Sequence, residues 1–433
     1  MPSQNVAPEG YLPRVIDAQI ERYLRLFGAV EITGTRWCGK TWSALAHGSS
    51  VTYVDRGANP QIVTADPTFA LQGTHPHVID EWQRVPTVWD YVRHAVDDAG
   101  GKRGMWILTG LSTPAKDQVS HSGAGRIGTL SMRPMTLQES GDSTASVSLS
   151  GLFEGRFVPC VAPQGIVPLV NMACRGGWPA NLKMSADDSL EIVRGYLSTT
   201  YSQSIQRLGG TPEIARRLVT SLARNAAQSV KLATLARDVY ATPEDSAPTD
   251  QEQRTISAHL QLLKDIYLVC EVPGWVPASR SPARMRTSPK YYFADQSVVP
   301  ATLGMGPQAL LQDWQTFGLV FESMCMRDLD VYARAVPGAA DTPLHYYHDD
   351  SGLEVDAVIE LADGRWGAFE VKTGEDKVAE ASENLIRMRN KLLRDPRRRV
   401  REPSFLGVLL ANGESARRNP DGIYVVPIRT LGA

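Results

Sequence analysis

The sequence has few features that would place the protein in an oxidising or membrane environment. Its cysteines are scattered and odd in number, and their spacing fits neither a zinc site nor a disulfide framework. No apolar run approaches the ~20 residues needed to cross a bilayer. The start lacks a basic segment followed by an apolar stretch, so no signal peptide is expected. We therefore expect a protein of the reducing cytoplasm. The five cysteines are Cys38, Cys160, Cys174, Cys270 and Cys325.

The chain also lacks a strong net charge, since 45 basic and 47 acidic residues leave a formal charge of −2. This balance gives no global indication of nucleic-acid binding, so any basic surface must be local. The hydrophobic share of 42% is typical of a globular protein, and a length of 433 residues predicts two or three domains.

Helical and strand patterns alternate over residues 11–140. Apolar residues at helical spacing predict helices over 16–27 and 87–98. Short apolar runs predict strands over 29–33, 51–55, 77–80 and 105–109. Strands that alternate with helices imply right-handed crossovers and a mostly parallel sheet.

A glycine-rich turn between the first strand and the next helix fits the pattern G-x-x-x-x-G-K-[ST] of a phosphate-binding loop. Its glycines let backbone N–H groups turn toward phosphate oxygens, and the new helix adds a positive dipole end. We expect Lys40 to reach the β- and γ-phosphates of ATP and Thr41 to hold Mg²⁺. The loop consists of Gly34, Thr35, Arg36, Trp37, Cys38, Gly39, Lys40 and Thr41.

Polar residues at the ends of later strands supply the remaining groups for ATP hydrolysis. Asp80 ends the strand 77–80 and is expected to steady Mg²⁺, while Glu81 polarises the attacking water. Thr109, at the end of the fourth strand, could hydrogen-bond that water or simply terminate the strand. Arg126 is either an arginine finger or a structural residue beside a Gly-rich loop. As a finger acting in trans, it would require a homo-oligomer.

The middle of the chain is mostly helical. Residues 187–224 show few strand signals, and two short helices are expected over 232–240 and 253–269. A segment rich in Pro, Ser and Arg follows over 272–293. This order resembles a winged helix, in which a β-hairpin follows the helices. A long helix is then expected over 308–332, before strands return over 344–348, 355–361, 366–372 and 404–410.

Acidic residues gather on a predicted β-hairpin near the C-terminus. With a three-residue loop, 362–364, and Gly364 in the left-handed conformation, Asp356 lies opposite Glu370 with Cβ atoms about 5 Å apart. A two-residue loop would slip the register and place the two acids on opposite faces. Two opposed carboxylates need a compensating cation. A divalent metal ion, with Glu322 as a third ligand and Lys372 activating water, would satisfy them. The alternative is an exposed hairpin with an ion pair to Lys372.

A helix Glu followed by Asp and then Glu-x-Lys on a hairpin resembles the PD-(D/E)XK restriction-endonuclease-like superfamily. Glu322, Asp356, Glu370 and Lys372 match these positions in order, and Val355 stands where that pattern has proline. The resemblance implies the fold and a metal-dependent nuclease site that takes Mg²⁺ or Mn²⁺.

Short stretches along nearly the whole chain share a second pattern. Besides the loop at 34–41, they are residues 11–14, 79–83, 107–110, 122–126, 175–179 and 352–356. Together they resemble a prokaryotic family of AAA-type ATPases with a C-terminal domain of unknown function. This resemblance implies ATP binding, a winged-helix-like middle and a nuclease-like end. The segment 175–177 is either a tight turn or a place where Arg175 faces nucleotide.

Two basic stretches are candidates for contact with DNA phosphates. One is the predicted wing and the other follows residue 386; for both, a solvated basic surface is the alternative. The first contains Arg280, Arg284, Arg286 and Lys290. The second contains Arg387, Arg389, Lys391, Arg394, Arg397, Arg398, Arg399 and Arg401.

The sequence therefore predicts an α/β protein with three domains. These are an AAA-type P-loop domain over 1–150, a helical and winged-helix-like domain over 151–305, and a restriction-endonuclease-like domain over 306–433. We expect an ATPase associated with DNA and carrying a nuclease-like site at its end. The alternative is a nucleotide-switched module that binds DNA or protein without cleaving it.

Overall fold

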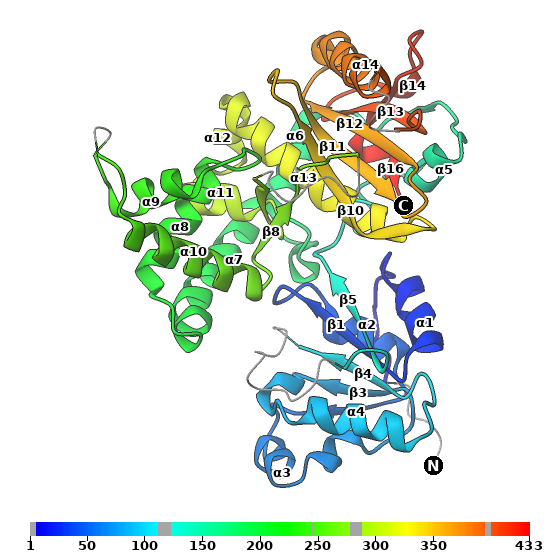
Figure 1. Cartoon of the computed structure of the whole chain (residues 1–433), viewed down its shortest axis with the longest axis vertical. Coiled ribbons are helices and arrows are strands. Elements are labelled where there is room, and N and C mark those ends of the chain that lie inside the picture. Colours follow the sequence, from blue (N-terminus) through cyan, green and yellow to red (C-terminus); the bar gives the residue numbers. More distant parts are fainter. Residues whose placement is uncertain (1–5, 111–122, 244–245, 278–287, 395–399) are drawn as a thin grey trace. The chain divides into compact units, whose positions relative to one another are not determined.

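A computed structural model describes residues 6–110, 123–243, 246–277, 288–394 and 400–433 (Figure 1). It divides into two compact units, each described here by itself. The first comprises Met1–Met135 with Asp265–Tyr267, and the second comprises Thr136–Lys264 with Leu268–Ala433. No helix among the described residues is long and apolar enough to cross a membrane.

The first unit is built on a parallel five-stranded sheet in the order β2-β3-β4-β1-β5. The predicted strand 77–80 is confirmed as β3, and β5 is a strand that the sequence patterns did not indicate. The elements are α1 (Asp17–Leu26), β1 (Ala29–Gly34), α2 (Lys40–His47), β2 (Ser50–Tyr53), α3 (Asn59–Ala65), the 3₁₀ turn η1 (Pro67–Leu71), β3 (His77–Asp80), the 3₁₀ turn η2 (Trp82–Arg84), α4 (Val88–Asp98), β4 (Trp106–Thr109) and β5 (Ile127–Met132).

Helices cover both faces of this sheet, which explains why β1, β3 and β4 are buried along their whole length. Ile20 of α1 and Leu45 of α2 pack with Val30 on one face. Trp82 and Trp89 pack with Leu108 on the other face. Because the five strands are parallel, their carboxyl ends all lie at the same end of the sheet.

The second unit joins a helical part to a mixed seven-stranded sheet in the order β10-β11-β12-β13-β15-β14-β7. Its elements are β6 (Val147–Ser148), α5 (Leu149–Phe153), β7 (Cys160–Val161), α6 (Ile166–Arg175), the 3₁₀ turn η3 (Pro179–Asn181), α7 (Ala186–Thr199), the π-helical turn η4 (Thr200–Ile205), α8 (Pro212–Arg224), α9 (Leu232–Tyr240), α10 (Asp250–Asp265), β8 (Val269–Val272), β9 (Lys290–Phe293), α11 (Val298–Leu303), α12 (Pro307–Gln312), α13 (Trp314–Ala335), β10 (Ala339–His348), β11 (Glu354–Leu361), β12 (Trp366–Lys372), η6 (Glu375–Lys377), α14 (Val378–Arg394), β13 (Phe405–Leu410), β14 (Ser415–Arg418), β15 (Tyr424–Pro427), η7 (Ile428–Thr430) and β16 (Leu431–Gly432).

The mixed sheet has a parallel centre and antiparallel flanks. Strands β12 and β13 are parallel, and α14 connects them and packs on one face through Leu385 and Met388. The hairpin of β11 and β12 is antiparallel. The edge strand β7 comes from the segment after the first unit and pairs with β14.

One long helix expected over 308–332 is instead two helices, α12 and α13. The break falls at Asp313, whose carboxylate accepts a hydrogen bond from the backbone N–H of Thr316 at 3.0 Å. An aspartate in this position caps the helix that follows it, so a continuous apolar pattern conceals a new helix start.

The segment 175–177 is a turn that is anchored within the second unit. Gly176 has φ 75° and ends α6, and the N–H of Gly177 donates to the Asp295 carboxylate at 2.7 Å. Any Cβ on Gly176 would lie 2.3 Å from the same carboxylate. Arg175 pairs with Asp142 at 2.5 Å. The tight-turn interpretation therefore accounts for both glycines.

Candidate functional site: a phosphate-binding loop and a carboxylate–lysine cluster

The loop between β1 and α2 has the backbone of an anion receptor. Gly39 and Trp37 adopt positive φ values of 104° and 68°, which is costly for tryptophan and turns successive N–H groups inward. Gly34 has φ 144°, and a Cβ there would meet the carbonyl oxygen of Met132 at 2.2 Å. The loop thus needs glycine at both conserved pattern positions for steric reasons.

Lys40 is buried at the start of α2, and its ammonium group folds back on the loop. Its Nζ donates to the carbonyl oxygens of Gly34 and Thr35, each at 2.9 Å. These two acceptors are neutral, so they leave the positive charge of Lys40 available to an anion. This arrangement places a desolvated cation where the inward-turned N–H groups converge.

The end of β3 lies beside the same loop. The Thr41 hydroxyl donates to Asp80 Oδ1 at 2.8 Å, and the Thr109 hydroxyl donates to the same oxygen over a shorter distance. Strand β4 lies between β1 and β3, so Thr109 reaches Asp80 from the neighbouring strand end. Thr41 and Asp80 supply oxygen donors of the kind that Mg²⁺ takes, and they fit that ion.

Glu81 follows Asp80 in a left-handed conformation, with φ 57°. This conformation turns its side chain away from the strand direction, and its Oε2 accepts a hydrogen bond from Gln83 Nε2 at 2.5 Å. Burial raises the pKa of Glu81, Asp80 raises it further, and Gln83 and Lys40 oppose the shift. A carboxyl with a raised pKa beside the phosphate loop is suited to accepting a proton from water.

Arg126 lies at the other end of the sheet from the loop. It directly precedes β5, its carbonyl accepts from the N–H of Ala29, and its Nε donates to Asp97 at 2.8 Å. The loop instead lies at the opposite ends of β1 and β5, where Gly34 pairs with Met132. Arg126 is therefore not brought together with Lys40 and Asp80 in one chain.

Arg14 is an arginine at the loop to which the sequence patterns gave no role. It is buried, and its two terminal nitrogens donate to the carbonyls of Cys38 at 2.8 Å and Arg133 at 2.7 Å. It therefore ties the phosphate loop to the end of β5. Only its membership of the 11–14 stretch could have indicated it.

In the second unit, the hairpin of β11 and β12 has the three-residue register. Gly364 has φ 82°, Leu361 N–H donates to the Arg365 carbonyl at 2.8 Å, and Ala357 pairs with Phe369. The prediction of this register is confirmed, and Asp356 and Glu370 share one face.

The positive charge of Lys372 lies close to the carboxylates of both Asp356 and Glu370. Its Nζ lies 2.7 Å from Glu370 and 3.6 Å from Asp356. Burial raises the pKa of Glu370 to about 8, with Asp356 adding to the shift and Lys372 opposing it. Among the residues that the structure describes, the Oε1 oxygen of Glu370 is buried and has no hydrogen-bond partner.

A second lysine, Lys290 on β9, lies in the same cluster. Its side chain is 2% exposed, and its Nζ lies 2.5 Å from Glu354 and 3.4 Å from Glu322. Tyr292 donates to Glu322 at 2.8 Å. Burial alone would lower the pKa of Lys290, but the carboxylates of Glu322, Asp356 and Glu354 together outweigh it and raise that pKa. Lys290 was expected on a basic wing, and this expectation is wrong because three acids surround it.

The cluster differs from the expected three-carboxylate metal site. Within the ranges that the structure describes, no group of three His, Cys, Asp or Glu residues is placed to hold a metal ion. Glu322, Asp356 and Glu370 are each contacted by an ammonium or hydroxyl donor, and Asp356 also accepts from the N–H of Val371 at 2.7 Å. Two internal cations, Lys290 and Lys372, thus lie among these carboxylates.

Family models match three separate parts of the chain. Residues 27–141 match a family model described as an AAA domain. The first unit carries an AAA-type domain. Two further models, each described as a domain of unknown function, match residues 168–309 (DUF8612) and 317–431 (DUF4143).

The relatives and solved structures that resemble this chain have low sequence identity to it. The uncharacterized proteins Mb2031c of Mycobacterium bovis and Rv2008c of Mycobacterium tuberculosis are each 28% identical over 362 residues, which cover 82% of this chain and 72% of theirs. The Walker-type ATPase paby2304 of Pyrococcus abyssi is 13% identical with a TM-score of 0.41, over 69% of this chain and 97% of that one. RuvB T158V of Thermotoga maritima is 16% identical with a TM-score of 0.29, over 62% and 94%.

The candidate basic stretches are only partly described. Arg280, Arg284, Arg286, Arg397, Arg398 and Arg399 lie outside the described residues. On α14, Lys391 pairs with Asp349 at 2.6 Å, which offsets its charge.

Proposed function

We propose that the chain binds ATP with Mg²⁺ at residues 34–41 and hydrolyses it. The observation that supports this most directly is Lys40, a buried ammonium group that donates to the carbonyls of Gly34 and Thr35. A triphosphate would replace those neutral acceptors with charged ones, and charge-assisted hydrogen bonds are roughly twice as strong as neutral ones.

Each neighbouring residue has a defined task in this proposal. Thr41 and Asp80 hold Mg²⁺, which when bound neutralises charge on the β- and γ-phosphates. Glu81 releases Gln83 and accepts a proton from the attacking water. Thr109 keeps the Asp80 carboxylate oriented through its hydroxyl, and Arg14 fixes the loop against β5. Arg126 belongs to the proposal only in trans, where it would act on nucleotide held by another copy of the chain.

ATP turnover and nucleotide binding test this function. In a purified preparation, Glu81→Gln is expected to bind ATP but lose hydrolysis, because the amide cannot accept the proton. Turnover unchanged in Lys40→Ala would remove the ATPase assignment.

A second candidate function is metal-dependent cleavage of DNA by the carboxylate–lysine cluster. It is favoured by one observation, the buried and unpartnered Oε1 of Glu370, which keeps a ligand position open beside Asp356. Incubating supercoiled plasmid with Mg²⁺ or Mn²⁺, and comparing Asp356→Ala, tests it. Without nicking by the native chain in either metal, the second unit would be a non-catalytic module that binds DNA or protein.

A further inference from the structure

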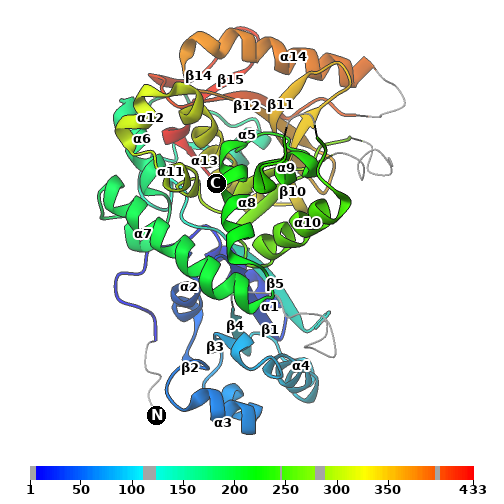
Figure 2. The same ribbon diagram turned by 90° about the vertical axis from the view of Figure 1, so that its left-hand side faces the viewer.

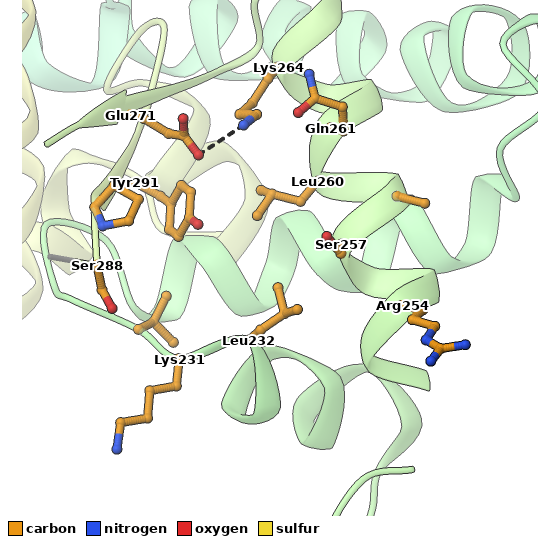
Figure 3. Close-up of a pocket in the computed structure, with 13 residues that line it drawn as sticks. Lys231, Leu232, Arg254, Ser257, Leu260, Gln261, Lys264, Glu271, Ser288 and Tyr291 are labelled. Carbon is orange, nitrogen blue, oxygen red and sulfur yellow. Dashed lines mark hydrogen bonds and ion pairs between the residues drawn. The ribbon is translucent and has the colours of Figure 1, made fainter. Parts of the chain in front are cut away.

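A groove of about 740 Å³, lined by both polar and apolar side chains, lies in the helical part of the second unit (Figure 3). Helix α10 forms one side, with the β8–β9 hairpin and the segment before α9 around it. The lining residues used below are Lys231, Arg254, Ser257, Gln261, Lys264 and Glu271.

The face of α10 that borders the groove has helical spacing and a distinct composition. Arg254, Ser257, Ala258 and Gln261 are all exposed and recur at i, i+3, i+4 and i+7. The opposite face is held in the core by Ile256 and Leu263. The small residues Ser257 and Ala258 therefore lie between the long polar side chains of Arg254 and Gln261. The buried face holds the helix in place.

Contacts within the helical part fix α10 in this orientation. His259 Nε2 accepts from the N–H of Thr211, before α8, at 2.9 Å. Between α8 and α9, Ser221 donates to Asp238 at 2.6 Å. Helices α8, α9 and α10 lie together (Figure 2). In the sequence they are followed by the antiparallel β8–β9 hairpin, the order of a winged helix.

The charges that line the groove favour an anion. Glu271 is the acidic residue of the lining, and Lys264 neutralises it at 2.9 Å. Lys231 and Arg254 are exposed, and among the described residues neither has an ion-pair partner. Lys231 also directly precedes α9, so it stands beside a helix N-terminus, where phosphate groups bind favourably.

The dimensions of this face fit a nucleic-acid duplex. Arg254 and Gln261 are seven residues apart, which is about 10 Å at 1.5 Å per residue. That length spans about three base pairs, since base pairs repeat every ~3.4 Å. Arginine and glutamine are side chains that read guanine and adenine through paired hydrogen bonds, and Ser257 and Ala258 allow the backbone to approach closely.

From these observations we propose that α10 reads double-stranded DNA. Its Arg254–Gln261 face enters the major groove, while Lys231 contacts a backbone phosphate. The major groove of an RNA duplex is too narrow and deep for this contact. A protein partner would be expected to meet large apolar or aromatic anchors, and Arg254, Ser257, Ala258 and Gln261 include none, although Leu232, Leu260 and Tyr291 line the groove beside them. The inference rests on the proposed association with DNA and gives it a location.

Fluorescence anisotropy of the full chain with a labelled 24-base-pair mixed-sequence DNA duplex tests the proposal. We expect Arg254→Ala and Lys231→Ala each to weaken binding about 3- to 10-fold, and the double variant to weaken it further. The slope of log affinity against log salt should fall by about one in Lys231→Ala, because Lys231 is the residue placed on a phosphate. Arg216→Ala, on α8 and paired with Glu213, is the matched control and should bind as the native chain does.

Three outcomes would overturn the inference. These are native affinity in the Arg254→Ala, Lys231→Ala double variant, equal or tighter binding of a matched RNA duplex, and no DNA binding by the native chain. The first leaves DNA association in place but elsewhere on the chain, while the last removes it altogether. ATP binding by the same variants, which alter the second unit alone, shows separately whether the ATPase assignment holds.

Discussion

Two buried lysines, one in each unit, differ in the groups that surround them. Lys40 is 7% exposed and donates to two neutral carbonyls, whereas Lys290 is 2% exposed and lies among three carboxylates. The charge of Lys40 is unopposed by those acceptors and can attract a ligand. The charge of Lys290 already stabilises the folded chain. The same residue type therefore serves binding in one unit and stability in the other.

Removing each ammonium group in turn tests this difference between Lys290 and Lys40. Lys290→Met leaves the largely buried Glu322 and the partly exposed Glu354 without their cation, and we expect the second unit to lose about 3 kcal/mol of stability. Chemical denaturation, followed by a signal from the second unit, measures the loss. Lys377→Met, on a more exposed lysine that pairs with Glu380, is the control and should change little. A stable Lys290→Met variant would show that the cluster does not need its internal cation.

Lys40→Ala should show the reverse pattern. We expect ATP binding and turnover to fall by about 100-fold or more, because the loop loses its one cationic side chain for the β- and γ-phosphates. Stability should change less than in Lys290→Met, since the lost hydrogen bonds go to two neutral carbonyls and no carboxylate loses its cation. Titration with a fluorescent ATP analogue measures the first effect and thermal melting the second. The exposed Lys102→Ala serves as the control.

The carboxylate–lysine cluster should also make stability depend on pH. Burial raises the pKa of Glu322 to about 7 and that of Glu370 to about 8, in both cases with Asp356 adding to the shift. A carboxyl whose folded pKa is raised stabilises the fold below its unfolded pKa of about 4.5 and loses that contribution as pH rises through the folded value. The melting temperature of the second unit should therefore fall between pH 5 and pH 8.

Glu370→Gln should flatten this pH profile by a few degrees, because the amide has no proton to lose. Differential scanning calorimetry at several pH values would detect the change. A native profile that is level from pH 5 to pH 8, or a variant profile as steep as the native one, would contradict the assignment.

The smallest effect is expected at Arg126. Six strand residues of β5 separate it from the edge of the sheet that bears the loop, about 20 Å at ~3.3 Å per residue. Arg126→Ala should therefore leave ATP affinity within about two-fold of native. A drop in turnover that appears only at high protein concentration would support action in trans, whereas a large loss of affinity in dilute protein would contradict the geometry.

The sequence predicted the strands that flank the first site because their signals are local. The phosphate loop, the strand 77–80 and the acids that follow it lie within short stretches whose spacing carries the chemistry. The register of the β11–β12 hairpin was predictable for the same reason, since Gly364 fixes the turn. The break at Asp313 was missed because the apolar spacing continues across it.

The second site was harder to predict because its members are distant in sequence. Lys290 stands in a stretch rich in arginine, so its neighbours in the chain suggested a solvated wing. Its true environment comes from Glu322 and Glu354, which only tertiary structure brings to it. Strand β5 was missed for a related reason, since Gly128 and the polar Thr129 and Ser131 interrupt its apolar pattern.

The edge strand β7 determines which fragments of the second unit keep their strand pairings. A fragment that begins at residue 306 would lack β7 and β6. Strand β14 would then keep β15 but have its other edge uncovered, β16 would lose its partner, and Asp328 would lose the backbone N–H of Leu137. An uncovered sheet edge invites aggregation. A fragment that begins near Thr136 retains these pairings, so it is the shorter version of the second unit that should be obtained in soluble form.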